Sequence, residues 1–282
     1  MMKQITCDLH VHTTCSDASR SVLQVMEYAK MIGLTHIAVT DHDTMKGVDL
    51  AQKLGREMGI RVIPGVEITT RDEETGRSVH MLCYLPKDRE KLEVFLKKTL
   101  KNRREQKLEM AEKIQKLYPC LTPQLVESYA KDSASIHECH IMQPLCDLGY
   151  TNTAIGTLME SLISSKGSCY VPSRYPATEE AAQVIRKAGG IAVVAHAQQF
   201  DSFGLIERYA KKHLIQGVEV WHPRNDDASR ERLIALAETY ALLKTGGSDY
   251  HGQYARNPKP LGCCGCTEEE VSALLEFRSV KN

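Results

Sequence analysis

The stretch ITCDLHVH, residues 5–12, has the apolar alternation of a β-strand and ends on two histidines. Side chains two positions apart on a strand point to the same face, so Asp8, His10 and His12 project together. One such pair of histidines is weak evidence for a site, because most isolated pairs are ordinary core or surface residues. Whether these residues indicate a functional site depends on which residues stand at the ends of the neighbouring strands.

Strand and helix patterns alternate outward from this stretch. Further strands are predicted at 36–42, 60–70, 79–86, 191–197, 217–223 and 242–252, and helices at 21–33, 47–59, 178–190, 205–214 and 229–241. The polar turn at 71–77 predicts a hairpin between two of the strands. Repeated strand–helix units favour an α/β fold whose parallel strands carry the chemistry at their carboxyl ends.

A long charged helical pattern over 88–118 interrupts the alternation, and shorter helical patterns follow around 123–130, 139–148 and 153–165. We therefore predict one α/β domain built from residues 1–99 and 171–282, with a helical insertion at 100–170. Glutamates interspersed among the basic residues 97–107 favour a solvated helix over a nucleic-acid surface.

The composition is that of an ordinary globular protein of 282 residues, with 42% hydrophobic residues and a formal net charge of zero. Zero net charge gives no field that would favour nucleic acid or a membrane surface. The chain shows no signal-peptide or transmembrane pattern, so we expect a cytoplasmic protein. The ten cysteines, including the cluster at 263–266, are expected to be free thiols.

An imidazole or a carboxylate stands at the edge of nearly every predicted strand. Beyond residues 8–12, these side chains are His42, Glu67, His80, His196, Asp249 and His251. Several divalent metals a few ångströms apart need mixed nitrogen and oxygen ligands, with a carboxylate between them to offset metal–metal repulsion. The absence of thiolates from these positions argues against a structural zinc site. The pattern indicates a hydrolytic metal centre.

The motifs DLHVHTTCSD, VTDHDT, PGVEIT, VHMLCYLP, AVVAHA and GGSDYHG resemble, in order and spacing, those of the polymerase-and-histidinol-phosphatase (PHP) superfamily. Within it, the chain looks most like stand-alone bacterial phosphoesterases of the nucleotide and 3',5'-bisphosphate phosphatase type. The resemblance covers residues 5–85 and about 170–252. It implies a distorted (β/α)7 TIM-like barrel with an inserted helical subdomain, and two or three manganese, zinc or iron ions.

The resemblance also implies which residues bind metal. The first metal would be held by His10, His12, Glu67 and Asp249, the second by Glu67 as a bridge with His80 and His196, and the third by Asp17, His42 and His251. Some relatives have histidine where this chain has Asp17, and a harder carboxylate ligand favours manganese or iron over zinc. The nucleophile would be a hydroxide bridging two metals.

Other residues are candidates for supporting roles. His222, His140 and Asp41 are candidate catalytic helpers, with Asp41 as an acceptor that orients an imidazole. Arg20, Arg174 and Arg224 are candidate phosphate contacts, although each alone is typical of surface charge. His36 is interpreted as a strand-entry residue, Asp43 as the start of a helix and Trp221 as core, and His137 is assigned no role.

Two segments depart from the nucleotide-cleaving relatives. Glu138-Cys139-His140 stands where they have Arg-Pro-His, and Ala197-Gln198-Gln199 where they have Pro-Gly-Arg. Arginine grips phosphate in a bidentate manner, so its loss changes how substrate is held. Gln198 and Gln199 could instead hydrogen-bond a neutral group.

The sequence leaves three functions open. The first is a phosphoesterase acting on a nucleotide-like or sugar phosphate, or on a short nucleic-acid end. The second is an amidohydrolase that cleaves C–N bonds, which the lack of a lysine in the motifs disfavours. The third is a non-catalytic, metal-stabilised binding module of the PHP type, which the filled ligand positions disfavour.

Overall fold

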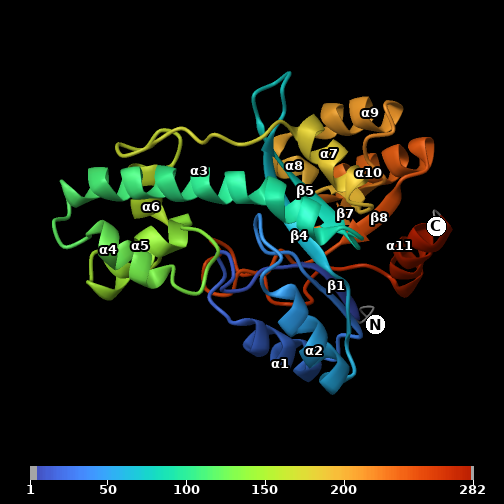
Figure 1. The fold of residues 1–282 in the computed structure, drawn as a ribbon, viewed down its shortest axis with the longest axis horizontal. Coiled ribbons are helices and arrows are strands. Elements are labelled where there is room, and N and C mark those ends of the chain that lie inside the picture. The colour runs from blue at the N-terminus through green and yellow to red at the C-terminus, as the bar shows by residue number, and fades with distance from the viewer. Residues whose placement is uncertain (1–4, 281–282) are drawn as a thin grey trace.

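The strands of the protein form two sheets, as the computed structural model shows (Figure 1). It describes residues 5–280, with side chains up to residue 277, so residues 1–4 and 281–282 of the expected barrel lie outside the described residues. The first sheet has the order β1 (Cys7–Val11), β2 (His36–Val39), β3 (Arg61–Val62). The second has the order β4 (Gly65–Arg71), β5 (Ser78–Tyr84), β6 (Ile191–Val194), β7 (Gly217–Trp221), β8 (Leu243–Gly246).

Most neighbouring strands are parallel, as expected, but β5 is antiparallel to both β4 and β6. The antiparallel pairing of β4 and β5 confirms the predicted hairpin at 71–77, because its turn is too short for the crossover connection that a parallel pair needs. The reversal has a functional consequence. His80 lies near the start of β5 and pairs with Thr69 near the end of β4, so it reaches the same sheet edge as the carboxyl ends of the parallel strands.

Two isolated parallel bridges bring the sheets together at both sides. Val11 at the end of β1 pairs with Tyr250, which follows β8. His42, just after β2, pairs with Glu67 of β4. These bridges place the segment after β8 beside the end of β1, and the segment after β2 beside the middle of β4.

Helices cover the outer faces of the sheets, with α1 and α2 on one side and α7 to α10 on the other (Figure 1). They are α1 (Val22–Met31), α2 (Val48–Met58), α7 (Thr178–Lys187), α8 (Ala197–Phe200), α9 (Phe203–Lys211), α10 (Asp227–Tyr240) and α11 (Glu268–Val280). Ser21 and Gln24 form a capping box at α1, and Gly59 ends α2 in the left-handed region. The short α8 and the C-terminal α11 were not predicted.

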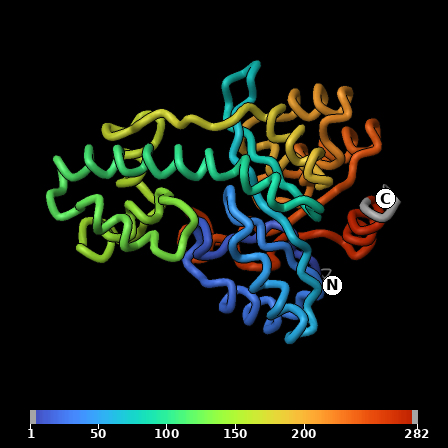
Figure 2. The backbone as a smooth tube through the Cα atoms, in the orientation of Figure 1, coloured from blue at the N-terminus to red at the C-terminus, as the bar shows by residue number. Residues whose placement is uncertain are grey.

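The remaining helices form an arm that extends away from the sheets (Figure 2). They are α3 (Arg89–Gln115), α4 (Pro123–Tyr129), α5 (Glu138–Asp147) and α6 (Thr157–Ile163). The first half of α3 gives Leu92 and Leu96 to the core beneath the strands, whereas Met110 and Ile114 join a separate core of the arm. The expected boundary at residue 100 therefore falls inside one continuous helix.

Several side chains lie in other surroundings than expected. Arg103 and Lys107, expected on a solvated helix face, are only 5% and 2% exposed. Trp221, expected in the core, is half-buried and donates a hydrogen bond to Glu270. All ten cysteines are free thiols, as predicted. Between residues 5 and 280, no helix combines the length and the apolar character needed to cross a membrane.

Candidate metal centre

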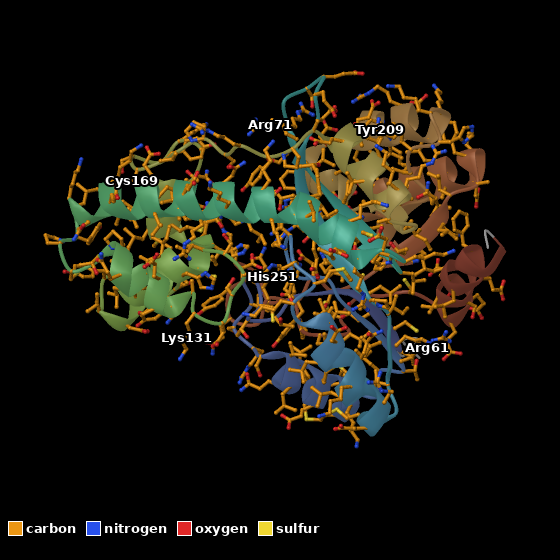
Figure 3. The ribbon with its side chains drawn as sticks, viewed as in Figure 1. Arg61, Arg71, Lys131, Cys169, Tyr209 and His251 are labelled. Carbon is orange, nitrogen blue, oxygen red and sulfur yellow. The ribbon has the colours of Figure 1, made fainter. Side chains whose placement is uncertain are left out.

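The structure brings all nine predicted ligands into one cluster where the two sheets meet. Figure 3 shows one of them, His251, near the middle of the molecule, between the arm that carries Cys169 and the helices near Tyr209. The cluster is mostly buried, and its most accessible members are Asp17, His80 and His251, with 14–17% of each side chain exposed. Substrate would therefore approach from this side of the cluster.

Glu67 is the centre of the cluster, because its two carboxylate oxygens face different histidines. Oε1 lies 2.9 Å from Nδ1 of His80 and 2.8 Å from Nε2 of His196. Oε2 lies 3.1–3.2 Å from ring nitrogens of His10, His12 and His42. A carboxylate with one oxygen toward each of two ligand sets has the arrangement of a bridging ligand.

Asp249 completes the set on the Oε2 side of Glu67. Its Oδ1 lies 3.4 Å from Nε2 of His12 and 3.7 Å from Nε2 of His10. The ligand atoms of these four residues all lie within 4.8 Å of one another. Asp249 adopts a positive φ of 53°, a conformation rare for residues other than glycine, which turns its carboxylate toward the cluster.

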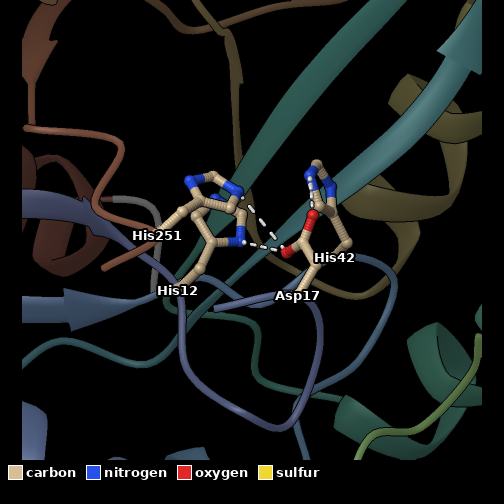
Figure 4. Close-up of side chains that lie close together, drawn as sticks. All are labelled: His12, Asp17, His42 and His251. Atoms are coloured by element: carbon tan, nitrogen blue, oxygen red, sulfur yellow. Dashed lines mark ion pairs between the residues drawn. The ribbon is translucent and has the colours of Figure 1, made fainter. Parts of the chain in front are cut away.

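A second group gathers around Asp17 (Figure 4). The carboxylate oxygens of Asp17 lie 3.4 Å from Nε2 of His251, 3.7 Å from Nε2 of His42 and 3.6 Å from Nδ1 of His12. Asp17 is contributed by the loop between β1 and α1, and His251 by the segment after β8. Residues more than 200 positions apart thus form one potential ligand set.

The donor atoms fit metal ions. Ligands that sit about 2.1 Å from one ion lie about 3–3.5 Å from each other, and the atom pairs described above are 2.8–3.7 Å apart, close to that spacing. Several of the atoms are buried and have no hydrogen-bond partner, a costly condition unless another group satisfies them. They include His10 Nε2, His12 Nε2, Asp17 Oδ1, His42 Nδ1, Glu67 Oε2 and His196 Nδ1.

The protonation states of the histidines differ across the cluster. Burial lowers the pKa of His42 to about 3 and that of His196 to about 4, so both imidazoles are neutral and keep a free lone pair. Burial opposes ionisation of Glu67, but the surrounding histidines hold its pKa well below the ordinary value. Burial likewise disfavours charge on His12, yet Asp249 and Glu67 raise its pKa to about 10. A metal would have to displace this proton.

Glu219 is a functional candidate that the sequence interpretation missed. It lies in the middle of β7, completely buried, and accepts a hydrogen bond from Nδ1 of His10 over 2.8 Å. Its other oxygen accepts from the backbone N–H of His196 over 2.8 Å. A signal was present in the sequence, because a glutamate inside the apolar strand GVEVW needs a buried partner.

His222 and Asp41 lie beside the predicted ligands. Nδ1 of His222 accepts the backbone N–H of Arg224 over 3.0 Å, so the ring proton is on Nε2, which lies 3.3 Å from Oδ2 of Asp249. Asp41 was expected to accept directly from an imidazole. Instead it accepts from Thr13 and Ser16, and only the Ser16 hydroxyl, 3.4 Å from Nδ1, reaches His12.

The arm contributes two histidines. His140 is buried, and its Nδ1 accepts the backbone N–H of His137 over 3.0 Å. His137, to which the sequence assigned no role, lies nearer to the metal ligands. Its Nδ1 is 3.8 Å from Oδ2 of Asp17, and its ring stacks on His42 with 5.9 Å between centroids.

The sequence suggested that Asp43 starts a helix, and this prediction was wrong, because the next helix, α2, begins at Val48. It has a positive φ of 57°, its side chain is completely buried, and its Oδ1 accepts the backbone N–H of Thr69 over 3.0 Å. Its other oxygen pairs with Arg103 of α3, which also donates to the Thr69 hydroxyl over 2.7 Å. This pair ties the arm to the loop that carries His42.

The candidate phosphate contacts are not part of the cluster. Arg20, Arg174 and Arg224 are exposed, and none contacts a predicted ligand through its side chain. The side-chain amide of Gln198 is occupied by Asp226 over 2.6–2.8 Å. Gln199 retains a buried side-chain oxygen without a partner, so of the two glutamines it is the one available to a ligand.

Comparison with known proteins points in one direction. A family model described as PHP domain matches residues 8–188. A phosphoribosyl 1,2-cyclic phosphate 1,2-diphosphodiesterase from Eggerthella lenta is 34% identical over 89% of this chain and 96% of its own length. A 3',5'-nucleoside bisphosphate phosphatase from Chromobacterium violaceum is 26% identical over 86% of both chains. The crystal structure of a protein from Bifidobacterium adolescentis, classed as a metal-dependent phosphoesterase, superposes with a TM-score of 0.88 at 31% identity, covering 96% of both chains.

Proposed function

This chain belongs to the PHP domain family, and from that premise we propose that it hydrolyses a phosphodiester bond in a small phosphorylated sugar. A metal-dependent phosphoesterase activity is established by the family and its relatives. The finer substrate class is our inference. The observation that carries the reaction type is Glu67, whose two oxygens face separate sets of histidines.

We propose three metal positions, of which the first two share this carboxylate. The first comprises His10, His12, Glu67 and Asp249, the second Glu67, His80 and His196, and the third Asp17, His42 and His251. Divalent metals held there would lower the pKa of bound water and polarise the phosphoryl oxygens. The carboxylate of Asp17 favours manganese or iron at the third position.

The protein's own side chains orient these ligands. Glu219 holds His10 with Nε2 toward the cluster, since its carboxylate engages the proton on Nδ1. His222 offers its Nε2 proton to the outer oxygen of Asp249. His137, which caps the start of α5, and His140 of α5 close the site on the side of Asp17 and exclude water from it.

We further propose that the strands close into a distorted seven-stranded barrel. The bridges Val11–Tyr250 and His42–Glu67 support this, since they connect the two sheets at both edges and leave only β3 outside the ring. In this description residues 100–170 form a subdomain over the active site. Its separate core and the approach of His137 to Asp17 support that division.

Three observations support a phosphodiester over a bisphosphate substrate. The relative from Eggerthella lenta, matched over nearly its full length, is a cyclic phosphodiesterase. Glu138 stands at an expected arginine position and pairs with Lys107. Gln199 presents a neutral amide where the resemblance predicts another arginine. A diester carries less negative charge than a terminal phosphate, so it needs fewer arginine contacts.

Turnover of three substrate types by protein reconstituted with manganese, zinc or iron tests the proposal. We expect a higher kcat/KM for a ribose cyclic phosphodiester than for a nucleoside 3',5'-bisphosphate or a 5'-phosphorylated oligoribonucleotide. The Asp249→Ala variant should lose turnover, while Asp132→Ala, an exposed aspartate, should not. Preference for the bisphosphate would overturn the substrate class. Turnover that survives in Asp249→Ala would overturn the proposed centre.

A further inference from the structure

A segment after β8 crosses from the metal centre to the arm and back. We call residues 252–262 the strap. Gln253 of the strap donates its backbone N–H to the hydroxyl of Ser19 over 2.8 Å. Tyr254 packs against the core of the arm, and Arg256 pairs with Glu160 of α6. The strap is therefore fixed to the protein along its first half.

The second half of the strap is fixed close to the centre. The backbone N–H of Gly262 donates over 2.9 Å to Asp8, whose other oxygen accepts from the backbone N–H groups of Ser248 and His10. Lys259 stands between Pro258 and Pro260, and each proline ring restricts the backbone. The strap thus presents Lys259 in a defined position.

The side chain of Lys259 is buried and lies against Asp249. Only 8% of it is exposed, and its ammonium pairs with Oδ2, the oxygen that also faces Nε2 of His222. Oδ1 of the same carboxylate faces His10 and His12. Asp249 therefore has one oxygen on the metal side and the other on the Lys259 side.

The charges of the loaded centre leave Lys259 in need of an anion. Asp17, Glu67, Asp249 and Glu219 carry four negative charges, which two divalent ions balance before Lys259 is counted, so the ammonium adds a positive charge in excess. Once a metal is bound to Asp249, the negative charge of this carboxylate is largely neutralised by the metal and no longer balances Lys259. A buried ammonium is costly without a counter-charge, and an ammonium has three donors, of which Asp249 uses one.

We propose that Lys259 binds a phosphoryl oxygen of the substrate beside the first metal position. The inference rests on the proposed metal centre and deepens it, by naming the cation that recognises phosphate. The exposed arginines at 20, 174 and 224 do not take this role, since they lie outside the cluster. Lysine acts here as a point charge held in place by the strap.

Inorganic phosphate is the probe for this proposal. Calorimetry of phosphate binding to manganese-loaded protein compares wild type with Lys259→Gln and Lys259→Arg, and metal content is measured in parallel. A hydrogen bond to a charged group corresponds to about 10- to 100-fold in affinity. We therefore expect Lys259→Gln to bind phosphate about 10- to 100-fold more weakly with unchanged metal content, and Lys259→Arg to recover part of the loss. The control Lys53→Gln changes an exposed lysine of α2 and should bind as wild type.

Different outcomes separate this inference from the function on which it rests. Unchanged phosphate affinity in Lys259→Gln would overturn it, and a lower metal content at unchanged affinity would reassign Lys259 to positioning Asp249. Wild-type protein that binds neither manganese nor phosphate would overturn the proposed centre itself, and this inference with it. Circular dichroism establishes whether each variant is folded. If Lys259→Gln does not fold, the phosphate affinity of Lys259→Arg, which keeps the charge, provides the test.

Discussion

Glu219 and His10 form a completely buried pair, with Oε1 of Glu219 2.8 Å from Nδ1 of His10. The carboxylate engages the proton on Nδ1, so Nε2 is the ring nitrogen that faces Glu67. Glu219 also accepts a hydrogen bond from the backbone N–H of His196. One side chain therefore orients two candidate ligands, His10 of β1 and His196 after β6. Glu219 does so from outside the three metal positions proposed above.

Glu219→Gln should weaken metal binding. Its neutral amide keeps the shape of the side chain but loses the charge that orients His10 and makes it more basic. Mutation of a residue that hydrogen-bonds a metal ligand typically lowers metal affinity or activity by about 10- to 100-fold. Metal content after dialysis against a series of free manganese concentrations measures the effect. Glu231→Gln, on the exposed face of α10, is the control. Equal metal content in both variants would show that Glu219 does not orient the ligands.

Arg103→Met should destabilise the fold strongly. Arg103 and Asp43 are 5% and 0% exposed, and removing one partner leaves a buried charge uncompensated, at a cost of about 3–5 kcal/mol in the free energy of unfolding. The neighbouring pair Arg104–Glu127 is 47% and 39% exposed, so Arg104→Met should cost no more than about 1 kcal/mol. Urea denaturation of both variants makes the comparison. Similar losses would contradict the role assigned to the buried pair.

The clustering of the nine candidate ligands could largely be predicted because their pattern is local. Parallel strands end at one edge, so a histidine or carboxylate after each strand places them together without knowledge of the packing. Even His80, on the reversed strand, follows from the short hairpin turn. The fold class was recognisable for the same reason, since each strand and helix carries its own periodicity.

The contacts around the ligands could not be predicted in this way. In the sequence, Arg103 cannot be distinguished from the other charged residues of a polar helix. It is buried beside Asp43 because α3 packs against the loop after β2. His137 and Lys259 likewise reach the cluster from the arm and the strap. Such contacts depend on long-range packing, which leaves no periodic trace in the sequence.

The pair formed by Glu138 and Lys107 should make stability depend on acid pH. Burial would raise the pKa of Glu138, but Lys107 at 2.7 Å lowers it from 4.5 to about 2. A carboxylate with a lowered pKa in the folded state contributes its stability above pH 4.5 and loses it as the pH falls toward 2.

Glu138→Gln should therefore be less stable than wild type at pH 7, and the difference should shrink between pH 5 and pH 2. The side chain of Glu138 is 40% exposed, so solvent screening reduces the size of the effect. Urea denaturation at several pH values measures it. Glu105→Gln is the control, since Glu105 and its partner Lys101 are both exposed. A difference that stays constant with pH would mean that the charge of Glu138 is not responsible.

Asp17→His should change the metal preference of the third position. The oxygens of Asp17 face ring nitrogens of His12, His42 and His251 at 3.4–3.7 Å, so it is the single oxygen donor in that group. Carboxylate oxygen suits manganese, whereas an all-imidazole set follows the general order of affinity that places zinc above manganese and iron. After incubation with equal concentrations of the three metals, mass spectrometry should find a higher ratio of zinc to manganese in the variant than in wild type. Asp132→His, which adds a histidine at an exposed position, controls for adventitious binding. An unchanged ratio would mean that Asp17 does not select the metal, and that the choice lies with the histidines it faces.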